Sequence, residues 1–245
     1  MTAGRTALVT GASRGIGALI AGKLAADGWD LLVSARSAGP LEEFATGLAG
    51  SARGRVRAVA ADMAVEADVL RLADAVTSGS GRLDALVLNA GMGSIGPFAD
   101  FPVRRFDKLY AVNVRSAFLL TQRLLPLLRS TAARHGTAKV IAVSSLTGVA
   151  GEPLNSAYGA TKAALTSLCE TLNTEESPGG VVATAVCPGY VATDMTAPLA
   201  DAVAPESMID AGDVAEVVVS LTRLSRSVVV PHVPMTRRGT HLWRA

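Results

Sequence analysis

The chain has 245 residues, of which 49% are hydrophobic and 18% charged, and its formal net charge is +2. Its length suits one α/β domain with a large core, and its mean hydropathy of +0.36 argues against disorder. The 23 basic residues are scattered, which argues against a nucleic-acid-binding surface. No apolar run reaches the ~18 residues that a membrane span needs. The strand pattern begins too early to leave room for a signal peptide, so we expect one cytoplasmic domain over residues 1–245.

The two cysteines, Cys169 and Cys187, are too few for a disulfide framework. The three histidines are scattered, so we do not expect a metal cluster that uses them together with these cysteines. Free cysteine usually packs as a small apolar residue. We therefore expect both thiols in the core of a protein from a reducing compartment.

Short apolar segments alternate with helix-length segments along the chain. The apolar segments are rich in Val, Leu and Ala and lack strict alternation, which is typical of strands buried on both faces of a parallel sheet. The alternation of strands and helices predicts βαβ crossovers, and hence a doubly wound α/β fold of the Rossmann type, with a seven-stranded parallel sheet and helices on both faces. Strands are predicted at 6–10, 30–35, 55–60, 83–88, 139–143, 181–186 and 227–230, and helices at 16–27, 41–49, 66–77, 103–128, 156–176 and 213–224.

A glycine-rich turn, TGASRGIG at residues 10–17, follows the first predicted strand and opens the first helix. Gly11 allows the tight turn out of the strand, Gly15 lets the backbone approach a pyrophosphate, and Gly17 permits close packing of helix on strand. The free N–H groups at the helix start, together with the helix dipole, favour phosphate groups. Because this turn lies between a strand and a helix, it predicts a dinucleotide site.

The end of the second predicted strand indicates which dinucleotide binds. An NAD site usually has an acidic residue there, but this chain has Ser-Ala-Arg at 34–36. Arg36 can form a charge-assisted fork to a ribose 2′-phosphate, and Arg14 of the glycine-rich turn can reach the same group. The alternative is that both are ordinary surface arginines. We predict NADP(H) as the cofactor.

Tyr158 and Lys162 lie four residues apart on a predicted helix, which places the phenol and the ammonium on one face. A free tyrosine has a pKa near ~10. A nearby lysine cation and an oxidised nicotinamide both favour the phenolate, so Tyr158 can act as general acid in reduction or as base in oxidation. A hydroxyl from Ser144 or Ser145, at the end of a strand, can hold a substrate oxygen where negative charge develops.

These motifs, in this order, resemble the short-chain dehydrogenase/reductase family over nearly the whole chain. Ser145 rather than Ser144 takes the family's serine position, because it lies thirteen residues before Tyr158. The matching positions are 10–17 for the glycine-rich motif, Asp62 for the acid that contacts adenine, Asn89, Ala90 and Gly91 for the motif after the fourth strand, Asn113, Ser145, Tyr158 and Lys162 for the catalytic tetrad, and 188–193 for the segment that holds the nicotinamide amide.

The resemblance implies a role for each member of the tetrad. Tyr158 donates the proton, Ser145 orients the carbonyl, Lys162 lowers the tyrosine pKa and binds the nicotinamide ribose, and Asn113 holds a water that links the lysine to solvent. No metal is required, because the tyrosine and the serine polarise the substrate. The candidate cofactor-binding residues are Gly11, Ser13, Arg14, Gly15, Ile16, Gly17, Arg36, Asp62, Met63, Asn89, Ala90, Gly91, Tyr158, Lys162, Pro188, Gly189, Val191 and Thr193.

Simpler structural roles remain open for three of these residues: Asn89 and Asn113 can be polar residues of a turn and a helix, and Asp62 can be a helix cap. The segment 193–210 lacks a strand pattern and is either a mobile flap over the active site or a plain surface connection. The walls expected for the substrate pocket are mainly apolar, which suits a small non-ionic substrate. They are Met92, Gly93, residues 146–154, Tyr190, Met195 and Leu199.

Several functions share this sequence pattern. The leading hypothesis is an NADPH-dependent carbonyl reductase. The alternatives are an alcohol or hydroxysteroid-type dehydrogenase working in the oxidative direction, and a catalytically silent NADP-sensing regulator. The complete tetrad argues against the regulator, which has no need of a proton relay. Glu152 disfavours an anionic substrate if it points inward, whereas Arg104 and Arg105 would suit an acyl thioester if they flank the entrance.

The resemblance also implies a homo-oligomer, with the long helices 103–128 and 156–176 at the dimer surface. The chain lacks the glycine-rich C-terminal stretch that supports a tetramer in many family members, so a homodimer and a homotetramer are both expected alternatives. Its last residues, 234–245, either form a frayed polar tail or bury Leu242 and Trp243 against a partner.

Overall fold

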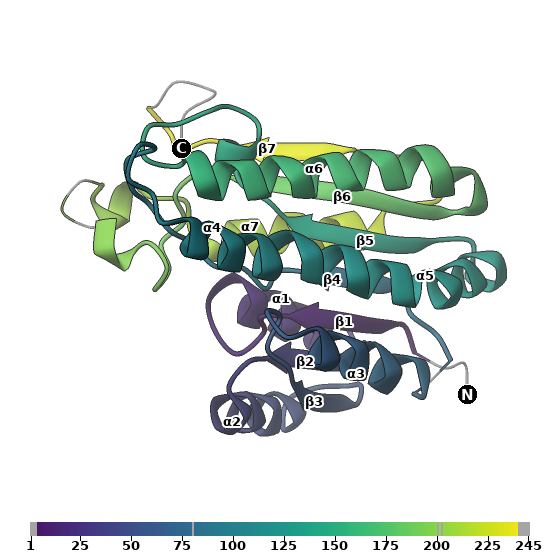
Figure 1. Cartoon of the computed structure of the whole chain (residues 1–245). Helices are drawn as coiled ribbons and strands as arrows, with labels where there is room; N and C mark the ends of the chain where they lie inside the picture. Colours follow the sequence, from purple (N-terminus) through teal and green to yellow (C-terminus); the bar gives the residue numbers. More distant parts are fainter. Residues whose placement is uncertain (1–3, 80, 200, 202, 240–245) are drawn as a thin grey trace.

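All seven strands of the computed structural model, which describes residues 4–79, 81–199, 201 and 203–239, lie in one parallel sheet. The strand order is β3-β2-β1-β4-β5-β6-β7, with helices packed on both faces (Figure 1). The predicted doubly wound sheet of Rossmann type is therefore confirmed. The strands are β1 (Thr6–Thr10), β2 (Asp30–Ala35), β3 (Val56–Ala60), β4 (Ala85–Leu88), β5 (Ala138–Val143), β6 (Val181–Pro188) and β7 (His232–Met235).

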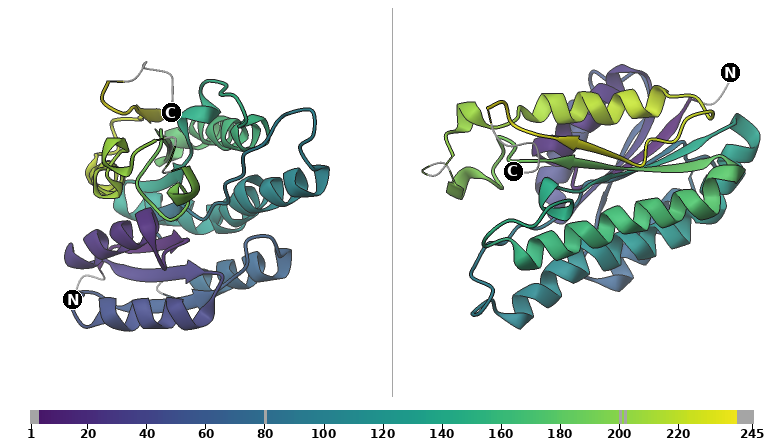
Figure 2. Two further views of the ribbon diagram at one scale, coloured as in Figure 1. Left: turned by 90° about the vertical axis from the view of Figure 1, so that its left-hand side faces the viewer. Right: turned by 90° about the horizontal axis from the view of Figure 1, so that it is seen from above.

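The helices form two layers, one on each face of the sheet (Figure 2). Helices α1 and α7 pack against each other on one face, beside α2, whereas α3 packs against α5 on the other face, beside α6. The α-helices are α1 (Gly15–Ala26), α2 (Ala38–Ala49), α3 (Glu66–Thr77), α4 (Val103–Tyr110), α5 (Ser116–His135), α6 (Ser156–Glu176) and α7 (Ala211–Arg223). Short helical turns are η2 (Leu146–Gly148), η3 (Ser177–Gly179), η4 (Ala197–Leu199) and η5 (Pro205–Ser207), and η1 (Ala111–Arg115) is a π-helix.

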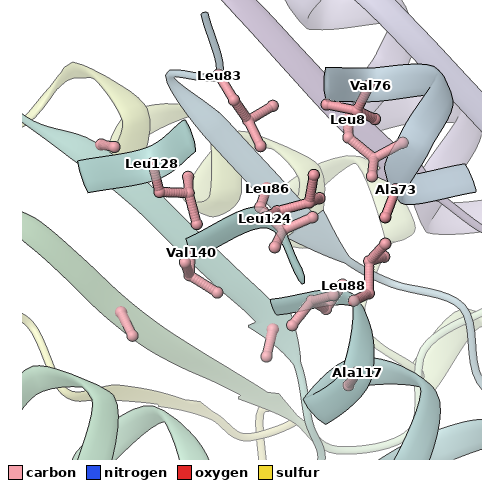
Figure 3. Packing of buried hydrophobic residues seen from close by; sticks show 14 of the residues in the cluster. Leu8, Ala73, Val76, Leu83, Leu86, Leu88, Ala117, Leu124, Leu128 and Val140 are labelled. Carbon is pink, nitrogen blue, oxygen red and sulfur yellow. The ribbon is translucent and has the colours of Figure 1, made fainter. Parts of the chain in front are cut away.

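Two apolar clusters, one under each helix layer, hold the sheet between the helices. Figure 3 shows the cluster in which Leu86 and Val140 of the sheet pack with Leu124 and Leu128 of α5. Each of these four side chains is no more than 1% exposed. Burial of their apolar surface together stabilises the fold by several kcal/mol. Both cysteines are buried in this cluster and are free thiols. None of the described helices combines the length and the hydropathy needed to cross a bilayer.

The last strand lies further along the chain than the pattern predicts. The prediction of a strand at 227–230 is wrong, because the chain uses these residues to return from the end of α7 to the edge of the sheet. Pairing with β6 begins where Ala185 N donates to the carbonyl of Pro231, at 2.9 Å. The observed strand, β7, contains Pro234 and lies at the edge of the sheet. An edge strand tolerates proline, because an N–H group that points away from the sheet is not needed for strand pairing.

The predicted helix 103–128 is present but differs in form and length. It consists of α4, the π-helical segment η1 and α5, and it continues to His135, where Gly136 ends it in the left-handed conformation (φ 92°). The last two turns are largely polar in sequence, so the apolar pattern from which the helix is predicted ends before the helix does. Thr131 nevertheless faces inward, and its Oγ1 accepts a hydrogen bond from Leu83 N at 3.0 Å. The predictions for Leu242 and Trp243 lie outside the described residues.

Candidate active site

The candidate residues gather at the carboxyl edge of the sheet, which is on the left in Figure 1. The strand order reverses between β1 and β4, so the loops that follow these two strands diverge and leave a crevice between them. In open α/β sheets a ligand binds at this switch point. The loops after β1, β2, β4, β5 and β6 carry the glycine-rich turn, Arg36, Asn89, Ser145 and Thr193.

The glycine-rich turn adopts a backbone that requires glycine. Gly11 and Gly15 have positive φ angles, of 65° and 55°. A Cβ on Gly17 would lie 2.2 Å from the carbonyl oxygen of Gly11, so only a glycine permits α1 to approach β1 this closely. The N-terminus of α1 carries no acidic residue in its first turn. This cradle of backbone N–H groups fits the phosphates of a dinucleotide.

Asn89 secures the turn from the neighbouring strand. Its Nδ2 donates to the carbonyl oxygens of Thr10 and Gly11, both at 3.0 Å. The Thr10 hydroxyl donates to Val87 O and accepts from the backbone N–H groups of Asn89 and Ala90, each at 3.1 Å. This role of Thr10 could not be predicted from the sequence, because threonine is common at the end of a strand. Asn89 therefore positions the turn, whatever its contact with a cofactor.

The two arginines predicted to meet a 2′-phosphate differ in their contacts. Arg36 follows β2, is exposed, and makes no hydrogen bond or ion pair with any other residue that the structure describes. Arg14 instead pairs with Asp194 in the segment after β6, with 3.2 Å between Nη1 and Oδ2. The fit to a 2′-phosphate therefore depends first on Arg36, whose guanidinium has no competing partner within the described chain.

Three more predicted cofactor-binding positions hold their own loops in place. Asp62 follows β3, and its Oδ1 accepts from Ala64 N at 2.9 Å. Met63 is buried in the core beside α3. Gly189 follows β6, and its N–H donates to the carbonyl of Met235 at 2.9 Å. Ser13 and Ile16 lie in the glycine-rich turn, and Pro188 and Val191 flank the end of β6.

Tyr158 and Lys162 share one face of α6, as their spacing predicts. The ammonium nitrogen of Lys162 lies 5.6 Å from the centroid of the tyrosine ring and donates to the carbonyl of Val143 at 2.7 Å. A Cβ on Gly91 would be 3.5 Å from that nitrogen and 3.6 Å from Asn113 Oδ1. The loop after β4 therefore lies directly against the lysine and the asparagine of the candidate tetrad.

The two serines after β5 have different roles. Ser145 is nearly buried, and its Oγ accepts from the N–H and the hydroxyl of Thr147, at 3.2 and 3.0 Å. A hydrogen bond with Ser145 also lowers the pKa of Tyr158, so serine and phenol are neighbours. The Ser144 hydroxyl donates to the carbonyl of Lys162 at 2.9 Å and contacts Thr166. The structure thus directs Ser145 to the site and Ser144 to the packing of α6.

Asn113 lies within the π-helical segment, a distortion that often marks functional positions. Its Oδ1 accepts from Met92 N at 2.8 Å, and its Nδ2 donates to Met92 O and to the hydroxyl of Thr161, both at 3.0 Å. Both amide protons are therefore used within the protein. The side chain fixes the loop after β4 beside Lys162, and the expected water on Asn113 has no free amide donor.

Burial shifts the two titratable groups of the site toward their neutral forms. It raises the pKa of Tyr158 to about 12, against the smaller lowering by Ser145, and it lowers the pKa of Lys162 to about 8. The expectation that the lysine lowers the tyrosine pKa is thus not met in the protein alone. The reason is that the ammonium lies beside the ring and is bound to Val143 O, while desolvation opposes charge on both groups.

This shift predicts a pH dependence of stability. The unfolded chain keeps the Lys162 proton up to about pH 10.5 and the folded chain only to about 8, so the unfolded state binds more protons in between and the free energy of unfolding rises with pH. The raised pKa values of Tyr158 and Cys169 oppose this only above 10.0 and 9.0. From pH 8 to 9, we expect urea denaturation to show a rise of about 1 kcal/mol in wild type relative to Lys162→Met. Equal pH slopes for the two proteins would contradict the shift.

Three loops form the walls expected for the substrate pocket. Met195 lies against Gly93, where a Cβ would be 3.3 Å from its sulfur. The Tyr190 hydroxyl donates to Glu152 Oε1 at 3.2 Å, so the carboxylate is turned toward this tyrosine. Leu154 has a positive φ of 65°, a strained conformation for a branched residue, and its carbonyl accepts from Gly96 N at 2.9 Å. These contacts fix the loops after β4, β5 and β6 relative to one another.

Comparison with known proteins agrees with this arrangement. A family model described as short chain dehydrogenase matches residues 5–204. The chain is 40% identical over 201 residues to a rhamnolipids biosynthesis 3-oxoacyl-[acyl-carrier-protein] reductase of Pseudomonas aeruginosa, covering 81% of this chain and 77% of that protein. The structure resembles a Pseudomonas aeruginosa RhlG/NADP active-site complex, with a TM-score of 0.85, 33% identity, and coverage of 96% and 95% of the two chains. It also resembles an alcohol dehydrogenase from the archaeon Thermococcus sibiricus complexed with 5-hydroxy-NADP, with a TM-score of 0.85, 27% identity, and coverage of 96% and 97%.

The chain belongs to the short-chain dehydrogenase/reductase family, as its motifs predict. It is an oxidoreductase of that family, whose named relatives act on hydroxyl or carbonyl groups. Of the two solved structures described above, one contains NADP and the other its derivative 5-hydroxy-NADP.

Proposed function

We propose that this protein is an NADPH-dependent reductase of a small, uncharged carbonyl compound. The proposal is supported by the grouping of Tyr158, Ser145 and Lys162 at the carboxyl edge of the sheet, where Lys162 lies against the loop after β4. It is also supported by Arg36 at the end of β2, which has no partner among the described residues. The names of the relatives, a 3-oxoacyl reductase and an alcohol dehydrogenase, support carbonyl–alcohol chemistry.

Each side chain has one task in this proposal. The glycine-rich turn holds the phosphates, Arg36 holds the 2′-phosphate, and Thr193 lies over the turn. When bound, the nicotinamide ring supplies the hydride and, in its oxidised form, a positive charge. Ser145 holds the substrate oxygen, and Tyr158, which keeps its proton because burial raises its pKa to about 12, donates that proton to the same oxygen. A neutral phenol is the form that a reductase requires before each turnover.

The proposed cofactor selectivity is tested by Arg36→Asp. The variant removes the fork that can hold a 2′-phosphate and adds an acid that can bind a 2′-hydroxyl, so we expect the ratio of kcat/KM for NADPH to that for NADH to fall by at least about 100-fold. The two ratios are measured at low cofactor concentration. Arg53→Asp, a change at another exposed arginine, is the control. An unchanged ratio in Arg36→Asp would refute the role of this arginine.

The proposed reductive direction rests on the choice of cofactor, because cells keep NADP(H) mainly in its reduced form, NADPH, which donates a hydride to a substrate. An oxidative role toward an alcohol uses the same residues and is the second candidate. A silent NADP sensor is disfavoured, since a protein that only binds the cofactor does not need a phenol beside Ser145 for proton transfer. NADPH consumption across ketones, aldehydes, quinones and 3-oxoacyl thioesters tests the function, and turnover in this screen rules out the sensor.

We also propose a cytoplasmic homo-oligomer, assembled through the faces of α4, α5 and α6. Support comes from large apolar side chains on the first two helices. Phe106, Tyr110 and Phe118 are 36%, 45% and 50% exposed, which is costly in water and is relieved by a second copy of the chain.

A further inference from the structure

The segment 193–195, which we call the strap, touches both sides of the crevice. On the nucleotide side, the methyl carbon of Thr193 is 3.7 Å from the position of a Cβ on Gly15. On the substrate side, Met195 packs against Gly93, with its sulfur 3.3 Å from a Cβ there. Three consecutive residues therefore connect the loop after β1 with the loop after β4. The strap therefore lies beside the glycine-rich turn that would hold the phosphates of a dinucleotide.

One ion pair ties the strap to the glycine-rich turn. Arg14 Nη1 lies 3.2 Å from Asp194 Oδ2, and the two side chains are 77% and 73% exposed. Neither side chain makes another hydrogen bond or ion pair within the described chain. An exposed pair of this kind contributes only about 0.2–1 kcal/mol. A stronger anion can therefore displace the carboxylate from the arginine.

A ribose 2′-phosphate is such an anion. It carries more negative charge than a carboxylate and accepts from a guanidinium with two oxygens at once. Arg36, on the adjacent loop, has no partner in the described chain and can bind it without competition. Arg14, in contrast, must first leave Asp194. The two arginines therefore differ in the free energy needed to bind the 2′-phosphate, because only Arg14 must first break an ion pair.

We propose that Asp194 is a positioning residue that sets the affinity for the 2′-phosphate: it holds Arg14 when the site is empty and releases it when the phosphate binds. The release also frees the strap from the glycine-rich turn, so that binding of the phosphate and the position of 193–195 are linked. This inference rests on the proposed use of NADPH.

The test uses two fragments of the cofactor, 2′,5′-ADP and 5′-AMP, and titration calorimetry on the full chain. In Asp194→Asn, no ion pair has to be broken before Arg14 can bind the phosphate. We therefore expect the Kd for 2′,5′-ADP to fall by about 2- to 5-fold and the Kd for 5′-AMP to stay unchanged. Glu206→Gln is the matched control. This exposed acid lies on the same connection between β6 and α7, and within the described chain it makes no ion pair. Its removal should leave both constants unchanged.

A double variant separates release of Arg14 from simple repulsion between Asp194 and the phosphate. In an Arg14→Gln background, Asp194→Asn should no longer tighten 2′,5′-ADP binding. A second measurement does not depend on affinity: hydrogen exchange of the amides in 193–199 should become faster in Asp194→Asn, and also in wild type when 2′,5′-ADP is added.

The outcomes distinguish this inference from the proposed function. If wild type binds 2′,5′-ADP no better than 5′-AMP, the proposed NADP selectivity fails. If wild type prefers 2′,5′-ADP but Asp194→Asn is unchanged, or if its gain persists without Arg14, the role of Asp194 alone is refuted. Unchanged exchange in 193–199 on adding 2′,5′-ADP would refute the link to the strap.

Discussion

Replacing Tyr158 by phenylalanine should lower kcat for carbonyl reduction by about 10²- to 10⁴-fold, the range that a positioned general acid contributes. The phenol hydroxyl is the proton donor that lies next to Ser145, and its raised pKa of about 12 keeps it protonated over the working pH range. The ring itself stays in place in the variant, so cofactor affinity and the midpoint of urea unfolding should change little. Steady-state kinetics, together with titration of NADPH fluorescence, separates loss of chemistry from loss of binding.

The control for this prediction is Tyr110→Phe. Tyr110 lies on α4, is 45% exposed, and contacts Phe106, with 6.2 Å between the ring centroids. Its hydroxyl has no part in the proposed chemistry, so kcat should remain within about 2-fold of wild type. Near-normal turnover in Tyr158→Phe would show that the proton comes from another group, and the account of the site would have to be abandoned.

Gly17→Ala should damage the site through the backbone rather than through lost chemistry. The new Cβ would lie 2.2 Å from the carbonyl oxygen of Gly11 and 2.4 Å from Asn89 Nδ2, distances at which α1 must move away from β1. We expect a loss of about 3 kcal/mol in the free energy of unfolding, in the upper range of overpacking effects, and a weakening of NADPH binding by more than about 10-fold. Urea denaturation and fluorescence titration measure the two effects.

Gly22→Ala is the matched control, because it makes the same substitution in the same helix. A Cβ on Gly22 meets no atom within 4 Å. Alanine in a helix interior is favoured over glycine, so this variant should gain about 0.5–1 kcal/mol and bind NADPH normally. If both variants behaved alike, the close approach of α1 to the glycine-rich turn would not be a constraint on the site.

The fold was largely predictable because most strands are buried on both faces and therefore carry continuous apolar runs. The predicted elements differ from the observed ones where a segment's burial does not follow its hydropathy. Val228 and Val229 are apolar but 38% and 39% exposed, so the apolar run there is a connection and not a strand. Conversely, the end of α5 is polar in sequence, yet Thr131 is fully buried there, and its hydroxyl oxygen accepts a hydrogen bond from Leu83 N.

The position of the candidate site could also be predicted, because its residues follow strand ends in a fixed order. What the spacing could not give is the set of partners each side chain takes. The spacing of four from Tyr158 to Lys162 fixes a shared helix face, but not the bond from the lysine to Val143 or the desolvation that shifts both pKa values. The partners of Arg14 and Asn113 come from loops 180 and 21 residues away along the chain, which no local pattern reveals.

Transfer of deuteride from 4-deuterated NADPH, with the label on the transferable face, shows whether the protein reduces a carbonyl with Tyr158 as the proton donor. The protein is incubated with a panel of ketones, aldehydes and 3-oxoacyl thioesters, and the products are analysed by mass spectrometry. We predict an alcohol that carries a single deuterium at the former carbonyl carbon with wild type, and at most a trace with Tyr158→Phe. Tight binding of NADPH with no labelled alcohol from any carbonyl, or equal labelling by both proteins, would contradict the account.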